Sequence, residues 1–215
     1  MLDIYNITRF PTRVINMGDR PMGGNHPIRL QSMTSTNTLD VKATVAQTIR
    51  IIEAGADYVR ISTPSIESAH KLKEIKSELK AAGFNNPLIA DIHFNPEVAL
   101  IAAPYTGEVR INPGNYTAGL SRSKTDFSAQ ETQEHLELIA NRLRPLVAVC
   151  KDHGTAIRIG TNMGSLSPRI VAKFGNTSQA MVESTLEFIK VFRGVDFHDL
   201  IISVKASKPL VMIQA

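Results

Sequence analysis

The sequence predicts an α/β fold, a parallel barrel of the (β/α)8 or TIM type that is truncated after about six strands. Three observations predict it. Short apolar runs alternate with helical patterns, which implies parallel strands joined by right-handed crossovers. Successive apolar runs end in charged or amide residues, as expected where strand ends converge on one barrel mouth. A closed barrel needs eight strands and about 250 residues, whereas this chain has 215.

The N-terminal region is predicted to plug the bottom of the barrel. Residues 12–33 hold two alternating segments around Gly18-Asp19 and Gly23-Gly24-Asn25, typical of a hairpin that leads into a first strand at Ile28–Met33. We expect residues 1–215 to form one incomplete barrel domain. Residues 1–27 would form the hairpin region, and residues 28–215 would form strands one to six with their helices.

The remaining elements repeat in a regular order. Asp40 is expected to cap a helix whose apolar residues follow helical spacing and stop at Gly55. Further strands are expected at 56–62, 87–93, 107–114, 155–160 and 200–207, and further helices at 65–83, 95–104, 131–153, 178–195 and from 208. The alternative is an open, doubly wound sheet of six strands. Against it, the polar residues 31–38 follow the first strand where a glycine-rich dinucleotide loop would be needed.

Composition excludes several classes of protein. Apolar residues make up 43% and charged residues 20%, which is ordinary for a globular chain, and the net charge of +4 includes no long basic run of the kind that tracks nucleic acid. No apolar run approaches the length of a membrane span, and the N-terminus resembles neither a signal nor a transit peptide. The single cysteine, Cys150, is expected to be a small buried hydrophobe. We expect a cytoplasmic protein without an internal disulfide or a thiol-built metal site.

The polar strand ends predict an anion-binding site. Arg60, Arg110 and Arg158 occupy equivalent places in their units, and Lys205 adds a compact charge on the next strand. The planar fork of arginine can donate two hydrogen bonds to one phosphate. An ion-pair network, in which carboxylates such as Asp91 offset the cations, is the structural alternative.

Two further features accompany these cations. Asp91 and His93 share one face of a strand, which suits proton transfer or simply holds the imidazole in one tautomer, and two ligands are too few for a metal site. The turns at 112–115 and 160–165 are rich in glycine and asparagine, so their amides could approach an anion, and the second is the better candidate. Other histidines are assigned no function: His70, His135 and His153 are expected to be exposed, and His26 and His198 border turns without an evident partner.

Six motifs in a fixed order resemble one known family. They are PIRLQSMTSTNTLDVKATV, GADYVRIS, LIADIHF, VRINPGN, IRIGTNMGSLS and SVKAS. They are similar to the IspG family of 4-hydroxy-3-methylbut-2-enyl diphosphate synthases, in its large form. That resemblance implies a TIM barrel that binds 2-C-methyl-erythritol 2,4-cyclodiphosphate, and reductive ring opening in the methylerythritol phosphate route to isoprenoids.

The resemblance also implies the site residues. Diphosphate contacts would fall on Arg60, Arg110, Arg158 and Lys205, helped by Asn112, Asn162 and Ser203, while Asp91 and His93 would lie near the reacting carbons. It implies a [4Fe-4S] cluster whose ligands lie outside residues 1–215, an insert domain, flavodoxin or ferredoxin as electron donor, and a homodimer. Without a transit peptide, a bacterial source is expected.

Two other functions stay open. A pterin-binding barrel of the dihydropteroate synthase type would share a phosphate site at the strand ends and need no cluster. A non-catalytic module for phosphate binding or assembly would bind anions without turnover. The residues alone also predict that a barrel of six strands associates with another copy, because its strand edges are exposed.

Overall fold

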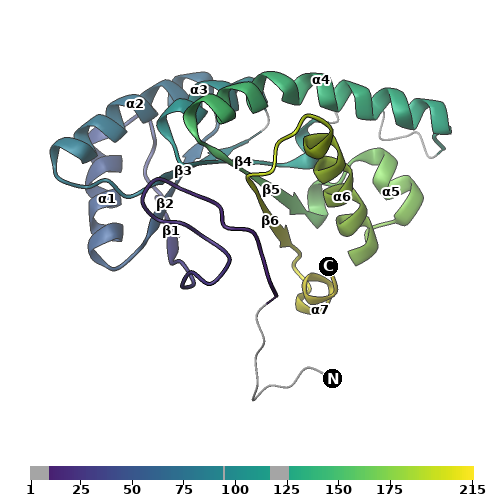
Figure 1. Ribbon diagram of the computed structural model, residues 1–215, viewed down its shortest axis with the longest axis horizontal. Helices are drawn as coiled ribbons and strands as arrows, with labels where there is room; N and C mark the ends of the chain where they lie inside the picture. The colour runs from purple at the N-terminus through teal and green to yellow at the C-terminus, as the bar shows by residue number, and fades with distance from the viewer. Residues whose placement is uncertain (1–9, 94, 117–125) are drawn as a thin grey trace, which may run out of the picture.

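The computed structural model describes residues 10–93, 95–116 and 126–215 (Figure 1). Six strands in these residues form one parallel sheet in the order β1-β2-β3-β4-β5-β6. The strands are Gln31–Met33 (β1), Tyr58–Thr63 (β2), Leu88–Ile92 (β3), Glu108–Ile111 (β4), Ala156–Asn162 (β5) and Leu200–Lys205 (β6). A doubly wound sheet reverses its strand order at a switch point, whereas this order is strictly sequential. The predicted barrel type is therefore confirmed.

The helices lie around the outside of the curled sheet, and β1 and β6 form its two edges (Figure 1). The helices are Val41–Glu53 (α1), Ile66–Ala81 (α2), Glu97–Ala102 (α3), Ala129–His153 (α4), Pro168–Phe174 (α5), Ser178–Gly194 (α6) and Pro209–Gln214 (α7). Short 3-10 turns lie at Ala103–Tyr105 (η1), Pro113–Tyr116 (η2) and Met163–Ser165 (η3). No helix in the described parts of the chain is long and apolar enough to cross a membrane.

Most helix boundaries follow from capping. The Asp40 side chain accepts a hydrogen bond from Ala43 N at 3.0 Å, which confirms the predicted start of α1. Helix α4 begins two residues earlier than expected, because Ser128 and Glu131 form a capping box. The sequence reading missed α5, a helix of 7 residues in which Ser167 is the N-cap.

Alternation along the strands divides the core into two parts. The outward residues of β2, Val59 and Ile61, belong to the large core between sheet and helices. The inward residue Tyr58 belongs to a smaller cluster at the bottom of the barrel, together with Ile15, Met17, Ile89, Ala156 and Ile201. The inner face is therefore apolar only at the N-terminal ends of the strands.

The predicted N-terminal hairpin is present and fills this bottom layer. Ile15 N donates to Met22 O at 2.8 Å, and Met22 N donates to Ile15 O at 2.9 Å. Gly18 in the turn has φ +56°, a left-handed conformation that glycine adopts without strain. Met17 is fully buried against the sheet. The first strand is shorter than expected, since only residues 31–33 pair with β2 over a full ladder.

Candidate anion-binding site at the strand ends

The sheet register brings the predicted polar residues to one face. In neighbouring strands Asp91 lies opposite Arg110, Arg110 lies opposite Arg158, and Asn162 lies opposite Lys205. Their side chains share the inner face with Tyr58, Ile89 and Ile201, two or more residues further along each strand. Above the apolar bottom layer, the inside of the sheet is thus lined by charged and amide groups.

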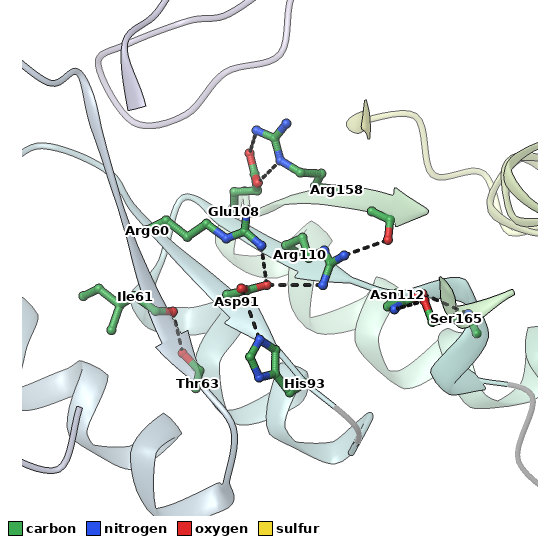
Figure 2. A network of polar contacts seen from close by, with 12 residues as sticks. Arg60, Ile61, Thr63, Asp91, His93, Glu108, Arg110, Asn112, Arg158 and Ser165 are labelled. Atoms are coloured by element: carbon green, nitrogen blue, oxygen red, sulfur yellow. Dashed lines mark hydrogen bonds and ion pairs between the residues drawn. The ribbon is translucent and has the colours of Figure 1, made fainter. Parts of the chain in front are cut away.

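Asp91 is the hub of this polar layer (Figure 2). Its Oδ1 lies 2.7 Å from Arg60 Nη2 and 3.5 Å from Arg110 Nη1, while Oδ2 lies 3.2 Å from His93 Nε2. Asp91 is only 3% exposed. One buried carboxylate therefore holds two guanidinium groups and one imidazole, and the ion-pair network expected as the structural alternative exists within the predicted site.

Arg110 is fixed on two sides. Besides Asp91, its Nη2 donates to the carbonyl oxygen of Gly160 at 2.8 Å. Burial lowers the pKa of Arg110, and the Asp91 carboxylate opposes that shift. An arginine pKa is high enough that the group stays charged throughout. The side chain is thus a buried, oriented cation.

Arg158 has a carboxylate partner that sequence reasoning missed. Its Nε and Nη2 donate to the two oxygens of Glu108, the latter pair at 2.8 Å (Figure 2). Glu108 lies opposite Ala156 in the register, so the arginine reaches back toward the bottom of the barrel. Burial raises the pKa of the Glu108 carboxyl, and Arg158 opposes that rise. Glu108 comes two residues before Arg110, so strand alternation could have placed it on the inner face.

Asn112 connects the two loops rich in glycine and asparagine. Its Nδ2 donates to Ser165 Oγ at 2.8 Å, and its Oδ1 accepts from Gly114 N at 3.1 Å (Figure 2). Both ends of the amide therefore have protein partners. Ser165, the second residue that sequence reasoning missed, belongs to η3. The clasp holds the η2 and η3 turns together at the rim of the site.

The other expected residues lie toward the open side of the mouth. Asn162 and Ser203 are half-buried, and Lys205 is exposed at the end of β6. Burial lowers the pKa of Lys205, and the nearby Arg60 and Arg110 lower it further. That repulsion indicates that the lysine shares the electrostatic environment of the arginines.

The site has a cavity and an excess of positive charge. Four cations (Arg60, Arg110, Arg158 and Lys205) face two carboxylates (Asp91 and Glu108), which leaves two positive charges. A cavity of about 340 Å³ is lined by His93, Arg110, Asn112, Asn115, Asn162, Gly164 and Ser165. A larger one of about 1090 Å³ adjoins it at Asn162 and extends to Lys205 and α5. An anion entering either cavity would offset the excess charge.

Two expectations for histidines outside the site were wrong. His135 is only 5% exposed, and burial, reinforced by Arg169 and Arg142, lowers its pKa to about 4. His198 does have a partner, since its Nε2 lies 3.1 Å from Asp196 Oδ1. His70 and His153 are exposed, as expected.

The residues of this chain do not fit an iron–sulfur cluster. Such a cluster is held by several thiolates, whereas the chain has one cysteine. Cys150 is buried, as expected, and burial raises the pKa of its thiol to about 12. Among the residues that the structure describes, no group of three His, Cys, Asp or Glu side chains could hold a metal ion.

Comparison with known proteins agrees with the geometry. The model of the GcpE TIM-barrel domain family matches residues 12–215. The 4-hydroxy-3-methylbut-2-en-1-yl diphosphate synthase (flavodoxin) of Phocaeicola vulgatus is 45% identical over 214 residues, which are 99% of this chain and 35% of the relative. The chloroplastic synthase (ferredoxin) of Oryza sativa subsp. japonica is 44% identical over 99% of this chain and 29% of its own length. The chain thus spans about a third of the length of these relatives.

Solved structures show the same fold at low identity. A dihydropteroate synthase from Xanthomonas albilineans, in complex with 7,8-dihydropteroate, superposes with a TM-score of 0.55 and 19% identity over 94% of this chain and 69% of that one. At this identity the likeness concerns the fold alone. The family model covers nearly the whole chain and names the fold that the sheet order shows, so the chain belongs to the GcpE TIM-barrel domain family.

Proposed function

We propose that this chain is the substrate-binding barrel of a 4-hydroxy-3-methylbut-2-enyl diphosphate synthase, an oxidoreductase of isoprenoid biosynthesis. Its substrate would be 2-C-methyl-D-erythritol 2,4-cyclodiphosphate. The observation that carries the proposal is the set of four cations on the inner face of the sheet, two of them in contact with Asp91, which leaves two positive charges in excess in a chain of this family. Multiple negative charges on a cyclic diphosphate would complement that excess.

The proposed contacts follow from which charged groups line the cavities or have only one protein partner among the described residues. Arg60, Arg110 and Lys205 would bind the phosphates, with Asn162 and Ser203 as polar helpers. Arg158 would contribute its charge without direct contact with the phosphates, because its Nε and Nη2 already donate to Glu108. Asn112 would act by ordering the two loops, because its amide has a protein partner at each end.

Asp91 and His93 are proposed to serve the reacting end of the substrate. The Asp91 carboxylate lies 3.2 Å from His93 Nε2, and this contact fixes the orientation of the ring. The imidazole, which is half-buried and lines the 340 Å³ cavity, would then move a proton to or from the substrate. Asp91 would act through His93 and through the two arginines.

The electrons must come from outside these residues. The resemblance implies a [4Fe-4S] cluster that supplies electrons when bound, and the single cysteine of this chain cannot provide the several thiolates that hold such a cluster. We propose that another part of a longer protein holds it, that flavodoxin or ferredoxin reduces it, as the names of the two relatives indicate for those enzymes, and that the enzyme works as a homodimer in a bacterial cytoplasm. Residues 1–215 alone are expected to bind substrate without turnover.

Calorimetric titration of the full-length protein with the cyclic diphosphate tests the proposal. Arg110→Ala should weaken binding about 10- to 100-fold, the range for a lost hydrogen bond to a charged group. Arg144→Ala, an exposed arginine on α4, is the matched control and should bind like wild type. Equal affinity in Arg110→Ala and wild type would contradict the proposed role of Arg110 in phosphate binding.

Titration with 7,8-dihydropterin pyrophosphate distinguishes the proposed function from the rival enzyme hypothesis. Binding of the pterin without the cyclic diphosphate would favour a barrel of the dihydropteroate synthase type. Anion binding in a full-length protein that shows no reductive turnover would favour the non-catalytic module.

A further inference from the structure

Gly160 lies beneath the guanidinium group of Arg110. A Cβ atom added to Gly160 would lie 2.1 Å from Arg110 Nε, 2.8 Å from Cζ and 2.9 Å from Nη2. Such distances are far shorter than the 3.5–4.0 Å at which non-bonded carbon atoms normally meet. The guanidinium therefore occupies the volume that any side chain at position 160 would need.

Backbone conformation does not explain this glycine. Gly160 lies within β5, opposite Ser203 of β6, and it is absent from the seven glycines with positive φ. Any residue could adopt its backbone angles, and glycine within a strand weakens that strand by entropy and lost packing. A glycine in this position is expected where another group approaches the backbone closely.

The same residue also holds the arginine by its backbone. The Gly160 carbonyl accepts from Arg110 Nη2 at 2.8 Å, and Asp91 Oδ1 lies 3.5 Å from Nη1 on the other side. Arg110 is 5% exposed, so these two contacts and the bare α-carbon define its place. Within the described residues, its buried Nε has no hydrogen-bond partner. The guanidinium group can therefore lie against the strand only because position 160 has no side chain.

We propose that Gly160 is a positioning residue that seats Arg110 for diphosphate binding, an inference that rests on the proposed function of the mouth. A methyl group at position 160 collides with the guanidinium end of a long side chain, not with the backbone of a neighbour. Gly160→Ala therefore leaves the fold in place and moves the guanidinium away from Asp91 and from the substrate. The variant can therefore distinguish a role of Gly160 in positioning Arg110 from a role in folding.

The test is a double-mutant cycle in the full-length protein, with the cyclic diphosphate and inorganic pyrophosphate as two calorimetric probes. Gly160→Ala should weaken the binding of both about tenfold, and it should change affinity less than about twofold when Arg110 is already alanine. Gly194→Ala is the matched control, because a Cβ at this end of α6 meets nothing within 4 Å. Wild-type affinity in Gly160→Ala, or full multiplication of the two effects in the double variant, would overturn the proposal.

A crystal structure of Gly160→Ala gives a readout that needs no ligand. The guanidinium of Arg110 should leave the Gly160 carbonyl while the strands keep their register. An unmoved guanidinium would overturn the seating role whatever the substrate is. A wild-type protein that binds pyrophosphate but not the cyclic diphosphate would contradict the proposed function. The role of Gly160 in positioning Arg110 would then still be tested by the double-mutant cycle measured with pyrophosphate.

Discussion

Arg60 Nη2 lies 2.7 Å from Asp91 Oδ1, and both side chains are largely buried at the barrel mouth. The same oxygen also faces Arg110 Nη1 at 3.5 Å. One negative charge is thus shared between two guanidinium groups. The mouth carries a net positive charge because the carboxylates are outnumbered, and each arginine is held in place by a carboxylate contact.

Replacing Asp91 by asparagine should separate these two effects. The variant retains the shape of the side chain and raises the excess from two to three positive charges. We expect pyrophosphate to bind about threefold more tightly at low ionic strength, with a steeper dependence on salt. Turnover of the full-length protein should fall about 100-fold, because His93 loses the carboxylate that orients it.

Calorimetry at two salt concentrations and steady-state kinetics measure both quantities. Asp152→Asn, an exposed position on α4, is the control for the lost charge. Weaker binding in Asp91→Asn would show that the carboxylate matters for anions chiefly by aligning Arg60 and Arg110.

The buried pair of Glu108 and Arg158 should show strong coupling. Removal of one partner leaves an uncompensated charge, which costs about 3–5 kcal/mol, whereas replacing both by apolar residues can be nearly neutral. Arg158→Met should therefore lower the free energy of unfolding by several kcal/mol, and Glu108→Leu/Arg158→Met should recover most of it. Urea unfolding of the two single variants and the double variant measures the coupling.

The pH dependence of Arg158→Met supplies an independent check. Burial raises the pKa of Glu108, and the variant loses the cation that opposes this rise. A carboxyl whose folded pKa exceeds its unfolded value stabilises below the unfolded pKa and loses that contribution as pH rises through the folded pKa. The variant should thus be relatively more stable near pH 4 than near pH 8. A constant difference from wild type across that range would contradict the buried, unpaired carboxylate.

The fold and the direction of the site residues could be predicted from the sequence because both depend on local periodicity. Alternation placed Asp91 and His93 on one face, and the Asp40 cap located α1. The partners of these residues could not be predicted in the same way. The contact between Glu108 and Arg158 joins residues 50 positions apart and depends on the register of two strands. The collision at Gly160 depends on a rotamer of Arg110, which no pattern encodes.

His135 shows the opposite case, in which a local signal existed. It stands four residues before Ile139 and eight before Leu143, both buried on the inner face of α4. Helical spacing of this kind places all three on one stripe. The polar neighbours in sequence lie on the other side of the helix and say little about the environment of the imidazole.

Asp57 should stabilise the hairpin that plugs the barrel. Its Oδ2 accepts from Leu30 N at 2.8 Å, and its Oδ1 lies 3.2 Å from Nη1 of both Arg20 and Arg29. The hydrogen bond from the Leu30 backbone, followed by these arginines, lowers the pKa of Asp57. Its stabilising contribution is therefore complete above the unfolded pKa of about 4 and is lost as pH falls through the folded value.

Asp57→Asn should lower the free energy of unfolding by about 1–2 kcal/mol at pH 7, a modest value because solvent screens the pair in part. The difference from wild type should shrink toward zero by about pH 2. Urea unfolding at the two pH values measures it, with Asp199→Asn as an exposed control. A difference that persisted unchanged at low pH would point to packing instead of charge.

The buried imidazole of His135 should make the protein sensitive to mild acid. Neither ring nitrogen has a hydrogen-bond partner in the described residues, and the pKa is lowered to about 4. The unfolded chain takes up this proton near pH 6.5, so stability falls as pH drops from there toward 4. A shift of this size amounts to about 2 kcal/mol between pH 6.5 and pH 4.5.

His135→Leu should remove that loss and flatten the dependence of the unfolding midpoint on pH. His153→Leu, at an exposed position on the same helix, should leave it as in wild type. If His135→Leu kept the wild-type slope, the acid sensitivity would have to come from other groups, because an apolar side chain at position 135 cannot bind a proton in either state.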